Sequence, residues 1–166
     1  MGALAALLLI AGLASGCGAA ATESPLAHAA DSPEALAREV LQAVERQDRT
    51  RLADLAVSED EFRALVWPKL PTSRPEVGLP FTYAWTDLQA KSQGYLHNTL
   101  ATFGGQRMRL VTIGFAGEST DYETFRVHRK SVLDVQAGSG ESQRVRLFGS
   151  MIEHGGRVKV FSYVVD

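Results

Sequence analysis

Hydrophobic positions follow a helical spacing in the first part of the chain and a strand spacing in the second. Between residues 32 and 103 apolar side chains recur three and four positions apart, which is typical of helices with one buried face. From residue 107 onward apolar and polar side chains alternate, which is typical of strands with one buried face. The sequence therefore predicts an α+β domain over residues 32–166, in which an antiparallel sheet packs on helices.

Capping signals place the starts of three helices before residue 68. Residues 32–34 (Ser-Pro-Glu) supply a capping hydroxyl, a proline for the first turn and an acid for the positive end of the helix dipole. The predicted buried stripe of this helix is Leu36, Val40, Ala43 and Val44. A second, short helix begins near Thr50. Residues 58–61 match a capping box, so a third helix follows and ends at Trp67-Pro68.

The longest predicted helix follows a proline-rich loop. Residues 68–84 contain four prolines, which deny both a helix and a central strand. Residues 86–89 match another capping box and predict the start of a helix that Gly104-Gly105 ends. Its predicted inward side chains are Leu88, Tyr95, Leu96, Leu100 and Phe103.

The alternating part of the chain predicts four strands and the pairing of two of them. The strands are expected over residues 107–115, 124–136, 142–153 and 157–165, with glycine turns at 138–140 and 155–156. A three-residue loop at 138–140 pairs Ala137 with Glu141. The register then places Asp134 opposite Arg144 and Leu133 opposite Val145.

This register divides the strands into two faces. The predicted core face carries Phe125, Val127, Leu133, Val135, Val145, Leu147, Met151, Val158, Val160 and Val164. The opposite face mixes basic with aromatic side chains, whereas a solvated face normally lacks large aromatics. We therefore expect a contact surface, for a second copy of the domain or another protein, made by Arg146, Phe148, Phe161 and Tyr163. The alternative is that these aromatics are present because they favour strands.

One position, Arg129, breaks the apolar pattern of the core face. Ser131 follows it in register, and the predicted pairing places Gly149 directly opposite Arg129. An inward arginine that faces a residue without a side chain predicts a cavity holding a guanidinium, which suits a carboxylate or a phosphate. The alternative is that Gly149 marks a bulge and that Arg129 lies near the sheet edge with its head in water.

The N-terminal segment is apolar and ends in small residues before the chain's one cysteine. Residues 4–13 are too few to span a bilayer, which takes roughly 20 residues, but are enough for the core of a signal peptide. Together with residues 15–17 (Ser-Gly-Cys) they resemble a bacterial lipoprotein signal. Residues 18–31 are rich in alanine and lack apolar periodicity, so with Cys17 they are expected to form a flexible tether over residues 17–31. The resemblance implies removal of residues 1–16 and a lipid on the sulfur of Cys17. It also implies an anchored protein of the cell envelope that faces the periplasm, held in the outer membrane. The alternatives are an ordinary secretory signal with a chance cysteine, or a buried helix.

The order of elements over residues 32–166 resembles the NTF2-like, cystatin-like fold. That resemblance implies a cone-shaped domain in which N-terminal helices pack on a curved four-stranded antiparallel sheet. The superfamily includes isomerases, dehydratases, ligand carriers and assembly modules. The fold therefore does not by itself select a function.

Composition excludes several classes of function. The chain is 45% hydrophobic and 22% charged with a net charge of −2, which gives no support for nucleic-acid binding. The four histidines have no metal-ligand spacing, and neither a nucleotide-binding motif nor a nucleophile elbow is present. We therefore predict no catalytic residue, no metal and no cofactor.

These features lead us to expect a non-catalytic binding or assembly module, tethered to the membrane, whose partner is a second copy or another envelope protein. The alternative is a small-molecule isomerase or hydrolase with an acid and base pair in the cone, for which Tyr95 and His97 are the candidate members. A third hypothesis is a purely structural lipoprotein that spaces or stabilises a complex.

Overall fold

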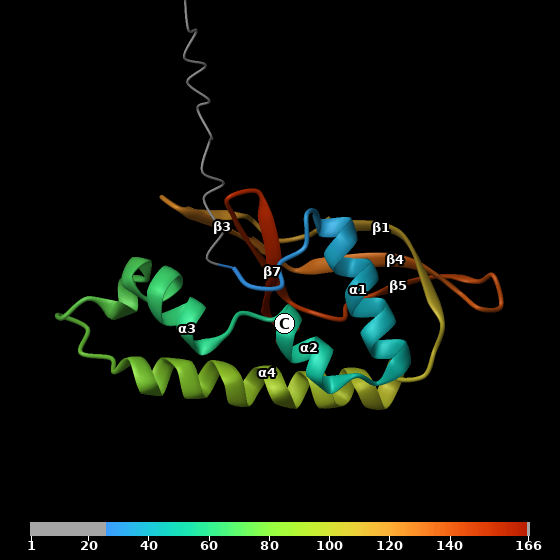
Figure 1. Ribbon diagram of the computed structural model, residues 1–166, viewed down its shortest axis with the longest axis horizontal. Helices are drawn as coiled ribbons and strands as arrows, with labels where there is room; N and C mark the ends of the chain where they lie inside the picture. Colours follow the sequence, from blue (N-terminus) through green and yellow to red (C-terminus); the bar gives the residue numbers. More distant parts are fainter. Residues whose placement is uncertain (1–25, 166) are drawn as a thin grey trace, which may run out of the picture.

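The computed structural model describes residues 26–165, in which helices come first and strands follow. The helices are α1 (Pro33–Arg46), α2 (Arg49–Leu55), α3 (Glu59–Glu61) and α4 (Phe81–Phe103), with a π-helical turn η1 (Phe62–Val66) and two 3₁₀ turns, η2 (Trp67–Lys69) and η3 (Pro71–Ser73). Figure 1 shows α4 along one side of the molecule, the strands on the other, and α1 and α2 between them. The predicted signal peptide and Cys17 lie outside the described residues. No helix in the described part has the length and apolar character needed to cross a membrane.

Local capping residues start α1 and α3, as predicted. The Ser32 hydroxyl accepts a hydrogen bond from the Ala35 amide at 3.1 Å, and α1 buries the predicted stripe. In α3 the capping box is complete, because the Ser58 hydroxyl accepts from the Glu61 amide while the Glu61 carboxylate accepts from the Ser58 amide.

The start of α4 corrects the prediction. The helix begins at Phe81 after Pro80, so residues 86–89 lie inside it and do not cap it. The added first turn carries Phe81 and Trp85, whose rings pack on Phe62. This distant contact stabilises a turn that the proline-rich sequence disfavours. Leu96 and Leu100 are buried as predicted, whereas Tyr95 is 38% exposed.

The strands form two antiparallel sheets in the described residues, and not the single curved four-stranded sheet expected. The strands are β1 (Met108–Phe115), β2 (Thr120–Tyr122), β3 (Phe125–Arg129), β4 (Ser131–Ala137), β5 (Ser142–Val145), β6 (Ser150–His154) and β7 (Arg157–Ser162). One sheet has the order β1-β4-β5 and the other β2-β3-β6-β7. Two predicted strands are each divided between the sheets, one at Lys130 and one over residues 146–149. At Lys130 the backbone has φ of 55°, a left-handed conformation that breaks a strand.

The β4–β5 pairing is the predicted one, but the β3–β6 pairing is shifted by one residue. Leu133 lies opposite Val145 and Asp134 opposite Arg144. Arg129, however, lies opposite Ser150 and not opposite Gly149. A shift of one residue exchanges the faces of a strand. Val127 therefore shares a face with Ile152 and Lys159, while Met151 and Val160 share the other face.

Both faces of the four-stranded sheet are covered, which removes most of the predicted contact surface. Phe148 and Tyr163 are 0% and 2% exposed and belong to the main core with α1 and α2. Phe161 is half-buried against a second apolar cluster centred on Phe62 and Ile152. Arg146 is also half-buried. The prediction failed because the alternating pattern does not tell how many faces of a sheet are covered.

The packed part of the chain begins before the predicted boundary at residue 32. Leu26, Ala29 and Ala30 are buried, although they lie within the predicted tether. Ala30 exchanges backbone hydrogen bonds of 2.9 Å with Val158 in β7. Residues 26–31 therefore form part of the folded domain.

Candidate functional site

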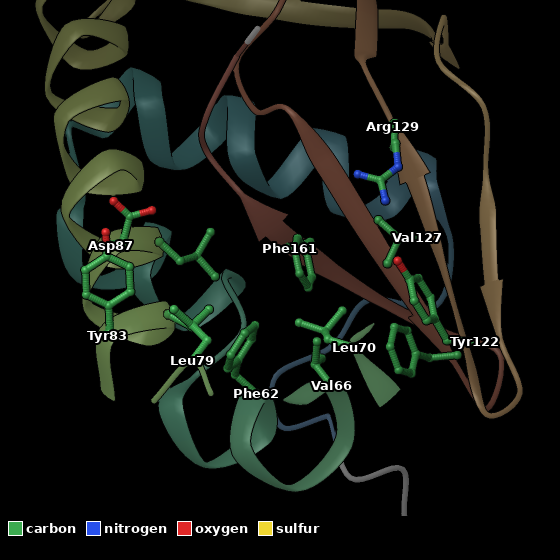
Figure 2. Close-up of a pocket in the computed structure, with 13 residues that line it drawn as sticks. Phe62, Val66, Leu70, Leu79, Tyr83, Asp87, Tyr122, Val127, Arg129 and Phe161 are labelled. Atoms are coloured by element: carbon green, nitrogen blue, oxygen red, sulfur yellow. The ribbon is translucent and has the colours of Figure 1, made fainter. Parts of the chain in front are cut away.

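A groove lies between α4, the η1 segment and one face of the four-stranded sheet. Its volume is about 310 Å³, and its lining is mostly apolar. Figure 2 shows side chains from these three parts of the fold turned towards the same space. The apolar residues of the lining include Phe62, Val66, Leu70, Leu88, Val127 and Phe161. This volume and character are typical of a site for a small molecule with an apolar body.

An aromatic cluster builds one wall of the groove. The Phe62 ring lies 5.4 Å from that of Trp85, 6.0 Å from that of Phe81 and 6.3 Å from that of Phe161, measured between centroids. The Arg63 guanidinium lies 3.7 Å from the centre of the Phe81 ring and covers it. The cluster joins η1, the first turns of α4 and β7, so these elements hold the wall in place.

A buried ion pair fixes the positions of Phe62 and Phe161. Lys159 donates to both carboxylate oxygens of Glu61, at 3.1 and 2.9 Å, and the two side chains are 2% and 6% exposed. The same carboxylate accepts from the backbone amides of Ala27 and Ser58. Because each carboxylate oxygen has two donors, the hydrogen-bonding capacity of the buried charge is satisfied. The ion pair also links residues 26–31, α3 and β7.

Two charged side chains line the groove from opposite sides, Asp87 on α4 and Arg129 on β3 (Figure 2). Asp87 accepts a hydrogen bond from Lys91 at 2.7 Å, which raises the pKa of the Lys91 amine above its ordinary value. In the described part of the chain, the Arg129 guanidinium has no carboxylate within ion-pair distance. The groove therefore carries one cation without an internal counter-ion.

Alternation along β3 aims Arg129 at the groove. Phe125, Val127 and Arg129 are two residues apart, so their side chains share one face, and all three line the groove. The first two are buried and Arg129 is exposed, which places its head at the rim. The face that Arg129 shares with Phe125 and Val127 is the predicted one, while its exposed head agrees with the alternative, in which the head lies in water.

The other two predicted pocket residues lie elsewhere. The Ser131 hydroxyl is fully buried and donates to the carbonyl of Phe148. Gly149 is pressed against Val164, because a Cβ atom at Gly149 would lie 1.6 Å from the Val164 carbonyl oxygen. Backbone, not a cavity, fills the space that the glycine leaves. The groove forms where helical residues far away in the sequence pack on the sheet. The concentration of aromatic residues between residues 62 and 85 is the sequence feature that could have indicated it.

A second polar constellation lies on the opposite face of the same sheet. The Ser119 hydroxyl is 2.9 Å from Nδ1 of His128, and Nε2 of His128 is 2.8 Å from the Glu153 carboxylate. The His128 ring also packs on Phe115, with centroids 4.9 Å apart. The alternating pattern does not predict β2, whose hairpin with β3 brings Ser119 beside His128, and so it does not predict this group.

The predicted acid and base candidates do not converge on the groove. Tyr95 is exposed, and exposed His97 lies 3.5 Å from an Arg49 guanidinium nitrogen through Nδ1. Among the described residues, no group of three or more His, Cys, Asp or Glu side chains is arranged to hold a metal ion.

Comparison of the chain with protein-family models, curated proteins and solved structures found no match.

Proposed function

We propose that this protein is a lipid-anchored binding module of the bacterial cell envelope, and that the groove is its binding site. The observation that carries the proposal is the groove itself, an apolar space of about 310 Å³ with one cation that has no partner within the described part of the chain. An apolar lining with a few placed polar groups is typical of binding sites for small molecules. Such a site needs no nucleophile or base.

The envelope location rests on the resemblance of residues 1–17 to a lipoprotein signal. Two or three acyl chains on Cys17 would hold the protein permanently at a membrane, because each buried methylene contributes about 0.8 kcal/mol. The likeness to NTF2-like domains belongs to the same proposal. Its support is the order of helices before antiparallel strands.

Native mass spectrometry of protein isolated from envelopes tests both halves of this proposal. We expect an acylated Cys17 and a non-covalent small-molecule adduct. The variant Ala84→Phe fills the groove and should abolish the adduct, whereas Ala90→Phe adds the same ring on α4 outside the groove lining and should retain it. A bare Cys17 thiol contradicts the anchor, and an adduct that survives Ala84→Phe contradicts the groove.

A hydrolase is the second candidate function, favoured by Ser119, His128 and Glu153. The glutamate would keep a proton on Nε2 of His128, leaving Nδ1 to accept the proton of the Ser119 hydroxyl as that oxygen attacks an ester carbonyl. The C–O bond to the alcohol would then break, the alcohol leaving with that proton, and water would hydrolyse the acyl group from Ser119 and release the acid. Hydrolysis of p-nitrophenyl acetate that falls at least a hundredfold in Ser119→Ala would support this function. Equal rates for Ser119→Ala and the unaltered protein would reject it.

A further inference from the structure

We propose that the groove binds a single-chain amphiphile with one carboxylate, the carboxylate on Arg129 and the chain against the aromatic wall. This inference rests on the proposed function, because it names the ligand class for the same groove. The two ends of the groove differ in chemistry, and each selects one end of the ligand.

The apolar end selects an alkyl chain or a narrow ring system. Phe62, Val66, Leu70 and Phe161 present no charge to the groove, so a polar ligand body would lose hydrogen bonds to water without replacement. The volume of about 310 Å³ lies at the small end of the range of roughly 300–1,000 Å³ found for small-molecule sites. It suits one chain and is too small for a two-chain phospholipid.

The rim selects a carboxylate. A guanidinium donates two parallel hydrogen bonds to a carboxylate, which an alcohol or an amide cannot accept in the same way. Arg129 is exposed at the end of its strand and has no carboxylate partner in the described residues, so a ligand does not have to displace an internal one.

The charge balance of the groove favours one negative charge over two. A phosphate monoester carries about −1.5 to −2 charges at neutral pH. Arg129 compensates one of these, while Asp87 on the opposite side repels the remainder and is itself already paired with Lys91. A monocarboxylate leaves no uncompensated charge beside Asp87.

The alternation of β3 also fixes the order in which the ligand lies. Phe125 and Val127 form a continuous apolar strip that ends at Arg129, two residues further along the same face. A bound chain would follow this strip from the rim towards Phe62. Each methylene added should therefore tighten binding about fourfold until the groove is full.

Tryptophan fluorescence reports directly on this site. The chain has two tryptophans, and the rings of both Trp67 and Trp85 lie within 6.5 Å of the Phe62 ring, centroid to centroid. The full chain carrying Cys17→Ser, which blocks acylation, is titrated with decanoate, decanol and decyl phosphate. We expect decanoate to bind about tenfold more tightly than decanol, the strength of a charge-assisted hydrogen bond at a solvated rim.

Arg129→Gln separates the head group from the chain. We expect it to remove the preference for decanoate over decanol while decanol binds unchanged. Arg46→Gln makes the same charge change at the end of α1 and should keep the preference. Ala84→Phe should weaken every ligand.

The outcomes distinguish the two proposals. If decanol equals decanoate and Ala84→Phe weakens both, the groove is a binding site but the carboxylate assignment is wrong. If decyl phosphate binds more tightly than decanoate, the head group is a phosphate and the inference is also overturned. If no ligand changes the fluorescence, or if every ligand binds Ala84→Phe as tightly as the unaltered protein, both proposals fail.

Discussion

Lys159 is a charged residue that the fold buries almost completely. Its amine lies 2.9 Å from Oε2 of Glu61, and both side chains are almost fully buried. The four hydrogen bonds on the carboxylate come from Lys159, Ala27 and Ser58. A buried pair of this kind adds little net stability over an apolar pair, but removing one partner leaves a charge without compensation.

We predict that Lys159→Met lowers the free energy of unfolding by about 3 kcal/mol, because the Glu61 carboxylate stays buried without its cation. Urea denaturation at neutral pH measures the change. Lys91→Met removes a lysine from the exposed ion pair with Asp87 and should change stability little. Equal changes in the free energy of unfolding for the two substitutions would show that the buried pair matters no more to stability than the exposed one.

The second residue-scale prediction concerns Tyr163, whose pKa is raised strongly by burial. Its hydroxyl donates to the carbonyl of Leu52 at 2.7 Å. The folded protein therefore keeps this proton at a pH where the unfolded chain, with an ordinary tyrosine pKa of about 10, loses it. The contribution of this raised pKa to the free energy of unfolding is fully present below about pH 10 and is lost as the pH rises above it.

We expect the free energy of unfolding to fall between about pH 10 and 11, and to fall less steeply in Tyr163→Phe. Denaturant unfolding across this range measures both slopes. Tyr95→Phe removes an exposed tyrosine and should retain the slope of the unaltered protein. A slope that is the same in Tyr163→Phe and Tyr95→Phe would contradict the assignment.

At the scale of elements, the chain changes sheets at Lys130. β3 and β4 would form one strand by their alternation, yet the left-handed backbone at Lys130 sends them into different sheets. The break allows β3 to contribute Arg129 to the groove while β4 pairs with β1 and β5. A β-branched residue is strained in this conformation and glycine is not.

We predict that Lys130→Val lowers the free energy of unfolding by about 1–2 kcal/mol and that Lys130→Gly does not lower it. Chemical denaturation of both variants tests this. Arg109→Val, at an exposed position inside β1, controls for the loss of a surface charge. Tolerance of valine at residue 130 would mean that the break is not fixed by this backbone conformation.

At the scale of the whole molecule, distant segments meet to form the groove. Its walls come from residues near 62, 84, 127 and 161. Residues 26–31 support two of these walls, since the Ala27 amide donates to Glu61 and Ala30 pairs with Val158. The groove is therefore coupled to the integrity of residues 26–31.

We predict that a chain beginning at residue 32 unfolds at a lower temperature than one beginning at residue 26. The shorter chain loses the buried Leu26, the bridge from Ala30 to β7 and a donor to the Glu61 carboxylate. Thermal unfolding followed by circular dichroism compares the two. Identical transitions would show that residues 26–31 pack without contributing stability.

The sequence by itself determined the features that depend on residues close together in the chain. Ser32 and Ser58 cap their helices through amides three residues away, and the 138–140 loop aligns Asp134 with Arg144 across a hairpin. It also placed Arg129 on the same face as Phe125 and Val127, although the Arg129 head is exposed and not enclosed in a cavity. These features follow from hydrogen bonds and alternation that operate within a few residues.

Only the tertiary structure decided the start of α4, the shifted pairing of β3 with β6, the burial of Lys159 and the position of the groove. Each depends on burial between segments that are far apart in sequence. Packing on Phe62 stabilises the helical turn that carries Phe81 and Trp85, and the Glu61 carboxylate compensates the buried charge of Lys159. Local patterns do not contain these contacts, because burying apolar surface and pairing charges depend on which segments meet in space.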